Sequence, residues 1–189
     1  CKALNVSSGV TLKFEDEAKL DINGKLNTNG ISDSKVYFTS VKDDTIAGDT
    51  NNDGSSSSPS KGDWKSINIV GPRGAFNKSN INHSEIRYGG GDKDTDYSIG
   101  GTASIQVSNS VVTKSKKNGI GAYGDITLNG SIISENEKCG LDVKNLSQSS
   151  NFNLRLSSNT FRSNKDYAAF AQFTHDNDRI TGSNNKGIN

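Results

Sequence analysis

The sequence feature that most constrains the fold is a pattern within residues 104–141 that occurs twice. In each copy two apolar residues alternate with polar ones and a third follows five positions later: Ile105, Val107 and Val112, then Ile126, Leu128 and Ile133. A further apolar residue, Ile120 or Leu141, lies eight positions beyond the third. A fixed pattern repeated after 21 residues indicates a chain built from stacked structural repeats.

The same pattern extends in both directions with insertions of different lengths. Phe161 occupies the position of Val112 in a later copy, with Ala169 eight residues beyond it, and Ile86 occupies that position in an earlier copy. Near the end, Ile180 is interpreted as the equivalent of Val112, because Ile188 follows it after the same eight-residue gap. We expect loops to accommodate the differences between copies.

The alternation within each copy has the period of a β-strand, and no copy contains a long stretch with helical spacing. Asn-Gly, Asn-Ser and Gly-Ser pairs, which favour turns, separate the short strands. Strands that recur about every 20 residues suit a parallel β-helix, in which each strand pairs with its equivalent about 4.8 Å away. The prediction is one all-β domain over residues 1–189, a β-solenoid of roughly seven coils with a long inserted loop near residues 42–63.

The composition excludes several classes of protein. Only 30% of the residues are hydrophobic and 20 are glycine, which alone would suggest disorder, but the ordered repeat outweighs this. The net charge of +1 and the lack of a basic stripe with aromatic residues argue against nucleic-acid binding. No apolar run is long enough to span a membrane.

Cys1 and Cys139 are the only cysteines. Cys139 stands two positions before Leu141, so strand alternation turns it inward and predicts a buried free thiol. Several coils separate the two residues, whereas a disulfide needs Cα atoms within about 7 Å, so we expect none. Cys1 permits two interpretations, the lipidated first residue of a bacterial outer-membrane lipoprotein or a proteolytic boundary.

The long loop contains the strongest chemical signal, Asp49-x-Asn51-x-Asp53-Gly54. Alternate oxygen-bearing side chains followed by a glycine turn are typical of calcium loops. The twelfth position is Ser60 and not a bidentate glutamate, so a further ligand is expected from Asp43, Asp44 or Asp63. The predicted ligands are Asp49, Asn51, Asp53, Ser55 and Asp63. The alternative is a turn without metal.

A second acidic loop contains Asp92, Asp94 and Asp96, and we favour a solvated loop over a calcium site there. Trp64, which follows the first loop, is interpreted as a buried lid on the first coils.

The sequence offers few candidates for catalysis. Arg87 with Glu85, or Arg155 with Arg162, could contribute to a lyase site, although Glu85 and Arg87 could equally form a surface ion pair. The predicted successive strands contain no cluster of aspartates, so the sequence does not indicate a hydrolase. Exposed aromatic rings are the usual platform for carbohydrate, and the candidates are Tyr88, Tyr97, Tyr123 and Tyr167.

Residues 10–12, 21–26, 36–40, 48–54, 62–64 and 85–90 resemble the opening coils and loops of bacterial right-handed parallel β-helix surface proteins, within the broad pectate-lyase-like superfamily. The resemblance implies a right-handed solenoid that is exported, at the bacterial cell surface or outside the cell, as a fragment or module of a larger protein. Members of this superfamily include polysaccharide lyases, hydrolases and adhesins.

These observations favour a non-catalytic module for adhesion or polysaccharide binding with a calcium-stabilised loop; the alternative is a polysaccharide lyase or glycoside hydrolase of the same superfamily. The expected partners are a polysaccharide or another surface protein, with a lipid anchor on Cys1 and a contact at the C-terminal end as further expectations. Ice binding is disfavoured, because Thr113, Thr127 and Thr160 occupy unrelated positions in the repeat.

Overall fold

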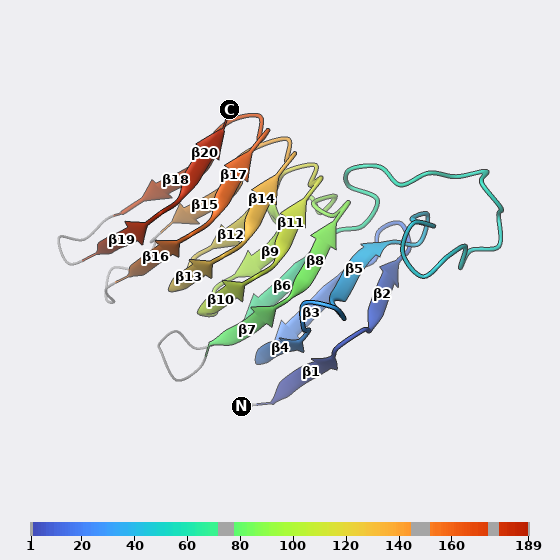
Figure 1. Cartoon of the computed structure of the whole chain (residues 1–189), viewed down its shortest axis with the longest axis horizontal. Helices are drawn as coiled ribbons and strands as arrows, with labels where there is room; N and C mark the ends of the chain where they lie inside the picture. The colour runs from blue at the N-terminus through green and yellow to red at the C-terminus, as the bar shows by residue number, and fades with distance from the viewer. Residues whose placement is uncertain (1, 72–77, 145–151, 174–177, 189) are drawn as a thin grey trace.

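The computed structural model describes residues 2–71, 78–144, 152–173 and 178–188 and contains twenty β-strands in three parallel sheets (Figure 1). Each turn of the chain contributes one strand to each sheet in a fixed order, so the molecule is a parallel β-helix of seven coils whose last coil has two strands. The described residues include no helix that could cross a membrane. The predicted fold class is confirmed.

The three sheets are named here by the order in which the chain enters them. Sheet A comprises β1 (Ala3–Ser7), β4 (Lys25–Asn29), β7 (Ser79–Asn82), β10 (Ile105–Ser108), β13 (Ile126–Asn129), β16 (Asn153–Ser157) and β19 (Arg179–Ser183). Sheet B comprises β2 (Thr11–Phe14), β5 (Val36–Ser40), β8 (Ser84–Arg87), β11 (Val111–Thr113), β14 (Ile132–Ser134), β17 (Thr160–Arg162) and β20 (Lys186–Ile188). Sheet C comprises β3 (Leu20–Asn23), β6 (Ile67–Val70), β9 (Tyr97–Gly101), β12 (Asn118–Ala122), β15 (Leu141–Lys144) and β18 (Ala169–Gln172).

The strand register agrees with the two best copies of the sequence pattern. Their equivalent residues are direct partners: Ile105 with Ile126, Val107 with Leu128, Val112 with Ile133, and Ile120 with Leu141. All eight side chains are fully buried. The inward apolar residues therefore form continuous columns, and burying them away from water is the main stabilising contribution to a chain with so few apolar residues.

The interpretation of the last copy is wrong. Ile180 pairs with Leu154, and Gly187 is the residue that pairs with Phe161. Ile180 is thus equivalent to Ile105 and not to Val112. The pattern failed here because a glycine occupies the position where the earlier coils have a large apolar residue.

The tight corners between strands use left-handed backbone conformations. Non-glycine residues with positive φ recur at equivalent corners: His83, Asn109, Ser158 and Asn184 between sheets A and B, and Tyr88, Lys114, Glu135 and Ser163 after sheet B. Such conformations are unfavourable for L-residues and persist where the surrounding structure compensates.

That compensation comes from serine and asparagine side chains stacked inside the corners. The backbone N–H of Ser84 donates to Ser110 Oγ at 3.0 Å, that of Ser110 to Ser131 Oγ at 3.2 Å, and that of Ser131 to Asn159 Oδ1 at 3.0 Å. These contacts satisfy buried amides that the strand ladders leave without partners. The high Asn and Ser content, which alone suggests disorder, therefore supplies internal hydrogen bonds.

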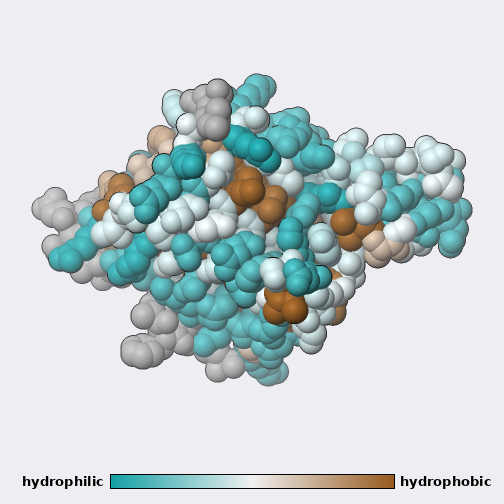
Figure 2. Space-filling view, viewed as in Figure 1, coloured by the Kyte–Doolittle hydropathy of each residue, from teal (hydrophilic) through white to brown (hydrophobic). Residues whose placement is uncertain are grey.

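The long loop leaves the coil between β5 and β6 and projects from one side of the molecule (Figure 1). From the same direction the surface is mostly hydrophilic, and the loop forms an arm at the right (Figure 2). Trp64 at its end is fully buried, stacks on Phe14 with ring centroids 4.5 Å apart, and donates from Nε1 to the Arg87 carbonyl oxygen at 2.9 Å. Its predicted burial is confirmed.

Cys139 is buried, as predicted, and burial raises the pKa of its thiol. Cys1 lies outside the described residues, so the disulfide and lipidation expectations are not addressed by the structure.

Candidate metal centre

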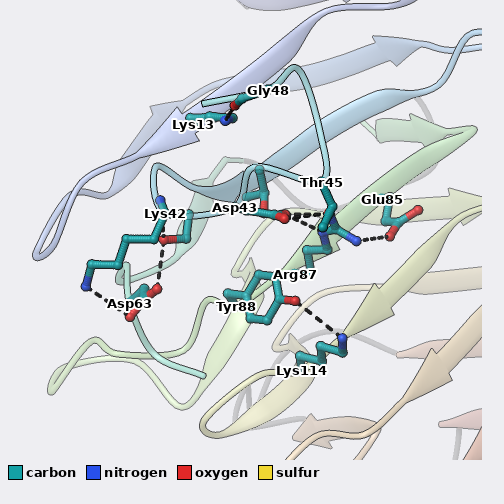
Figure 3. Close-up of polar contacts among 12 residues, drawn as sticks. Lys13, Lys42, Asp43, Thr45, Gly48, Asp63, Glu85, Arg87, Tyr88 and Lys114 are labelled. Carbon is teal, nitrogen blue, oxygen red and sulfur yellow. Dashed lines mark hydrogen bonds and ion pairs between the residues drawn. The ribbon is translucent and has the colours of Figure 1, made fainter. Parts of the chain in front are cut away.

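The beginning of the long loop is fixed to sheet B by a buried carboxylate. Asp43 is completely buried and accepts hydrogen bonds from Thr39 Oγ1 at 2.5 Å, Thr45 Oγ1 at 2.6 Å and Arg87 Nε at 2.7 Å (Figure 3). Burial raises the pKa of Asp43, but the hydrogen bonds from the two hydroxyl groups and the charge of the guanidinium lower it by more. The pKa of Asp43 therefore lies below its ordinary value. Asp43 is therefore ionised and fully engaged as a structural anchor.

The end of the loop is closed by a second carboxylate. Asp63 accepts from Ser40 Oγ at 2.7 Å, from the backbone N–H of Ser60 at 3.0 Å and from Lys42 Nζ at 3.4 Å. Ser40 ends β5 and Lys42 begins the loop, so these contacts join the two ends of the loop, as Figure 3 shows for Lys42 and Asp63. Asp43 and Asp63 together form the base of the loop.

Beyond this base, three carboxylates converge. Oxygen atoms of Asp44, Asp49 and Asp53 all lie within 4.8 Å of one another. The backbone orients one of these side chains, since the N–H groups of Asp53 and Gly54 donate to Asp49 Oδ1 at 3.3 Å and Oδ2 at 2.8 Å. Asp53 Oδ2 accepts from Asn51 Nδ2 at 2.8 Å and from the Ser57 hydroxyl, whose hydrogen bond lowers the pKa of Asp53.

Several oxygen atoms in this cluster lack a partner. Asp44 Oδ1, Asn51 Oδ1 and Asp53 Oδ1 are buried and make no hydrogen bond within the described part of the chain. Buried acceptors without donors are costly, and in native proteins they usually mark a bound water or ion. No described lysine or arginine forms an ion pair with the three carboxylates; Lys13 donates to the Gly48 carbonyl oxygen instead, at 2.5 Å. The chemistry of this donor set, hard oxygens only, fits a divalent cation such as calcium.

The predicted ligands divide into two groups. The first group, Asp49, Asn51 and Asp53, lies together with Asp44. Asp44 is one of the three residues expected to replace the missing glutamate. Ser55 is exposed, and Asp63 lies at the base of the loop and not among the clustered carboxylates.

The second acidic loop already contains a cation from the protein itself. Lys117 Nζ donates to the carbonyl oxygens of Asp92 at 2.5 Å and Thr95 at 2.7 Å, and it lies 3.5 Å from Asp96 Oδ1. Lys138 Nζ lies 3.4 Å from the same carboxylate oxygen. Burial raises the pKa of Asp96, but the two ammonium groups more than offset this, and the pKa lies below its ordinary value. An ammonium group of the protein itself is thus surrounded by oxygen atoms of this loop.

The four candidate tyrosines differ strongly in exposure. Tyr88 is buried beside Arg87 and Lys114, whose ammonium lies 5.2 Å from the ring centroid. Tyr97 is also buried, and burial raises the pKa of its phenol well above its ordinary value. Its ring covers Gly121, where a Cβ atom would lie 2.1 Å from a ring carbon, so only glycine fits beneath it.

Tyr123 is half-buried, whereas Tyr167 is 60% exposed. The Tyr167 ring packs beside Phe170, itself 40% exposed, with centroids 6.0 Å apart. Phe170 was not among the sequence candidates. It follows Ala169, which stands eight residues after Phe161 as Leu141 does after Ile133, so strand alternation would have turned Phe170 outward.

The candidate catalytic side chains are not assembled into a site. Arg87 bonds to Asp43, Glu85 and Thr45, so it is committed to ion pairs and hydrogen bonds. Arg155 and Arg162 lie on sheets A and B respectively.

Comparison of the chain with protein-family models, curated protein sequences and solved structures gave no match.

Proposed function

We propose that this chain is a non-catalytic binding module of a bacterial cell surface, belonging to the pectate-lyase-like parallel β-helices, whose long loop is ordered by calcium. The observation that carries the proposal is the cluster of Asp44, Asp49 and Asp53 with three buried, partnerless oxygens nearby. The oxygens belong to a loop whose base is fixed by Asp43 and Asp63, so a cation would order only its outer part.

The ligand set favours calcium over other metals. It contains no nitrogen or sulfur, which argues against zinc and copper, and it lies on an irregular loop that suits the flexible coordination of calcium better than the strict octahedron of magnesium. A site of three carboxylates without a bidentate glutamate is expected to be weak, in the range of about 10⁻⁴–10⁻³ M found for extracellular modules. Such a site would be filled outside the cell, which supports the proposed location.

The proposed partner is a surface polysaccharide, and the Tyr167–Phe170 pair supports this choice. Two adjacent exposed rings give an amphipathic surface on which the apolar face of a sugar ring can pack. Binding is favoured over catalysis because Arg87, the candidate base, is engaged with Asp43 and Glu85.

Thermal unfolding of the parent chain in millimolar calcium and in EGTA tests the proposal, alongside Asp49→Ala/Asp53→Ala. A cation that binds only the folded state stabilises it by about 2.7 kcal/mol at 100 times its Kd and proportionately less near its Kd. We expect calcium to raise the Tm of the parent and to protect the backbone amides of residues 44–57 from hydrogen exchange. Both effects should disappear in the double variant.

Asp33→Ala, an exposed aspartate outside the loop, is the matched control and should keep the full calcium response. Equal Tm and equal exchange of the parent in calcium and EGTA would overturn the calcium site.

A further inference from the structure

A hollow on the outer face of sheet A lies on a different side of the molecule from the acidic loops. It has a volume of about 400 Å³ and is lined by Thr127 of β13, by Arg155, Leu156 and Ser157 of β16, and by Thr181, Gly182 and Ser183 of β19. The strands β7, β10, β13, β16 and β19 run side by side along the lower left of Figure 1, whereas the long acidic loop projects to the right.

Arg155 is the centre of this hollow. It is an exposed residue of β16 and is the direct partner of Thr127 on one side and Thr181 on the other. Among the residues that the structure describes, no hydrogen bond or ion pair engages its guanidinium. A guanidinium on a rigid strand presents several N–H donors in a fixed fork that suits a polyatomic oxyanion.

The hydroxyl groups around Arg155 extend this donor set. Lys78 Nζ donates to Thr127 Oγ1 at 3.3 Å, which leaves the Thr127 proton free to point outward and adds a second positive charge at the edge. Ser157 Oγ donates to Asn129 Oδ1 at 2.9 Å and keeps its lone pairs as acceptors. The hollow therefore offers donors for an anion and both donors and acceptors for neighbouring hydroxyl groups.

Among the described residues, the outward side chains of sheet A next to the hollow carry positive charge; Asp178, the carboxylate that precedes Arg179, accepts from the backbone N–H of Phe152 at 2.8 Å. The outward residues of β7, β10, β13, β16 and β19 include no carboxylate, and Arg179 at the start of β19 adds a third cation. Asp125, which precedes β13, accepts from the backbone N–H of Asn153 at 2.9 Å. The acidic loops leave the coil at the corner between sheets B and C. This separation of charge would steer an anionic polymer towards sheet A although the net charge of the chain is only +1.

We infer that this hollow binds a sulfate or phosphate ester carried on a hydroxyl-rich polymer. The Arg155 fork and the Thr127 hydroxyl take the oxyanion, and Ser157, Thr181 and Ser183 bind hydroxyl groups of the polymer. This inference rests on the proposed function, since it takes the module to bind a polymer, but it uses neither the calcium loop nor the Tyr167–Phe170 pair.

The test measures binding of the full chain to four polymers with one backbone: dextran sulfate, dextran phosphate, carboxymethyl dextran and dextran. The parent should bind the sulfate or the phosphate polymer, or both, and which of them binds identifies the source of the oxyanion. Arg155→Ala should weaken that binding about tenfold or more, because a hydrogen-bonded charged group is lost, and Arg155→Lys should restore only part of it.

Arg162→Ala is the matched control, because Arg162 is an exposed arginine of the same coil on sheet B, and its affinity should equal that of the parent. Equal weakening in both arginine variants, or binding to carboxymethyl dextran alone or to dextran alone, would overturn the oxyanion site.

Each measurement is made in calcium and in EGTA, so that the two proposals can fail separately. Arg155-dependent binding without any calcium response would refute the metal site and leave the oxyanion site standing. A calcium response with no binding of either ester polymer would refute the oxyanion site and leave the metal site standing.

Discussion

The two acidic loops of this protein look alike in sequence and differ in what neutralises them. Both contain alternating acidic residues, both follow a strand of sheet B, and both lie on adjacent coils. In the loop of residues 92–96, Lys117 from the next coil inserts an ammonium group among two carbonyl oxygens and a carboxylate. In the loop of residues 43–63, three carboxylates meet with no described ammonium partner, and three buried oxygens lack donors.

The comparison shows that a pattern of acids does not by itself define a metal site. The deciding feature is whether another part of the fold delivers a cation. The first loop contains both situations, since Arg87 neutralises Asp43 at its base while the tip has no such partner. Replacing each internal cation in turn therefore tests how the two loops differ.

The largest effect is expected for Arg87→Met. Asp43 is fully buried, and removing its guanidinium partner leaves a buried charge with only two hydroxyl donors; breaking a buried ion pair typically costs about 3–5 kcal/mol. We expect the free energy of unfolding at pH 7, measured with urea, to fall by roughly 3 kcal/mol. Glu85→Gln, which removes the other acidic partner of Arg87, is the matched variant and should cost much less, because Glu85 is partly exposed.

The pH dependence of stability distinguishes the loss of the ion pair from the loss of packing in Arg87→Met. The lowered pKa of Asp43 in the folded parent contributes stability that is present above its unfolded pKa, about 4, and is lost as the pH falls through the folded pKa. In Arg87→Met, burial without the guanidinium should raise that pKa, so the difference in stability between parent and variant should shrink as the pH is lowered from 7 to 3. A difference that is constant over this range would show that lost packing, and not charge, causes the destabilisation.

A smaller effect is expected for Lys117→Met. The methionine keeps much of the volume but removes a charged donor from the carbonyl oxygens of Asp92 and Thr95, so stability should fall by about 1.5–3 kcal/mol. The same substitution is then combined with Asp49→Ala/Asp53→Ala, which removes the calcium response of the long loop. In this triple variant, millimolar calcium should restore part of the Tm that Lys117→Met lost, because oxygen atoms surround the position left by the ammonium group. Absence of any calcium response there would show that an ammonium position in this fold does not convert to a metal position.

The smallest effect is expected for Lys138→Met. Lys138 contacts the same Asp96 oxygen as Lys117 does, but both partners are almost half exposed, and exposed ion pairs contribute only about 0–1 kcal/mol. Urea unfolding should place this variant within about 0.5 kcal/mol of the parent. If Lys138→Met lost as much stability as Lys117→Met, the contact of Lys117 with the Asp96 carboxylate, and not its hydrogen bonds to the carbonyl oxygens of Asp92 and Thr95, would be the main stabilising interaction in this loop.

The sequence predicted the parts of the fold that depend on local periodicity. Alternation around Ile105 and Ile126 identified the strands, and their recurrence identified the stacking, because a solenoid requires equivalent residues to lie above one another. The prediction failed at Ile180, where Gly187 interrupts the apolar column. Asp49, Asn51 and Asp53 could also be grouped from sequence, since residues two apart in one loop stay close in any fold.

Contacts between coils were beyond the sequence. The pairing of Arg87 with Asp43, the insertion of Lys117 into the second loop and the burial of Tyr88 and Tyr97 all depend on how insertions of different length position one coil against the next. The sequence by itself determined that this chain is a parallel β-helix with two acidic loops, because periodicity and turn residues act over a few residues. Only the tertiary structure decided which loop already has a cation, because a lysine 21 residues or more away reaches one loop, and no described ammonium group pairs with the carboxylates of the other.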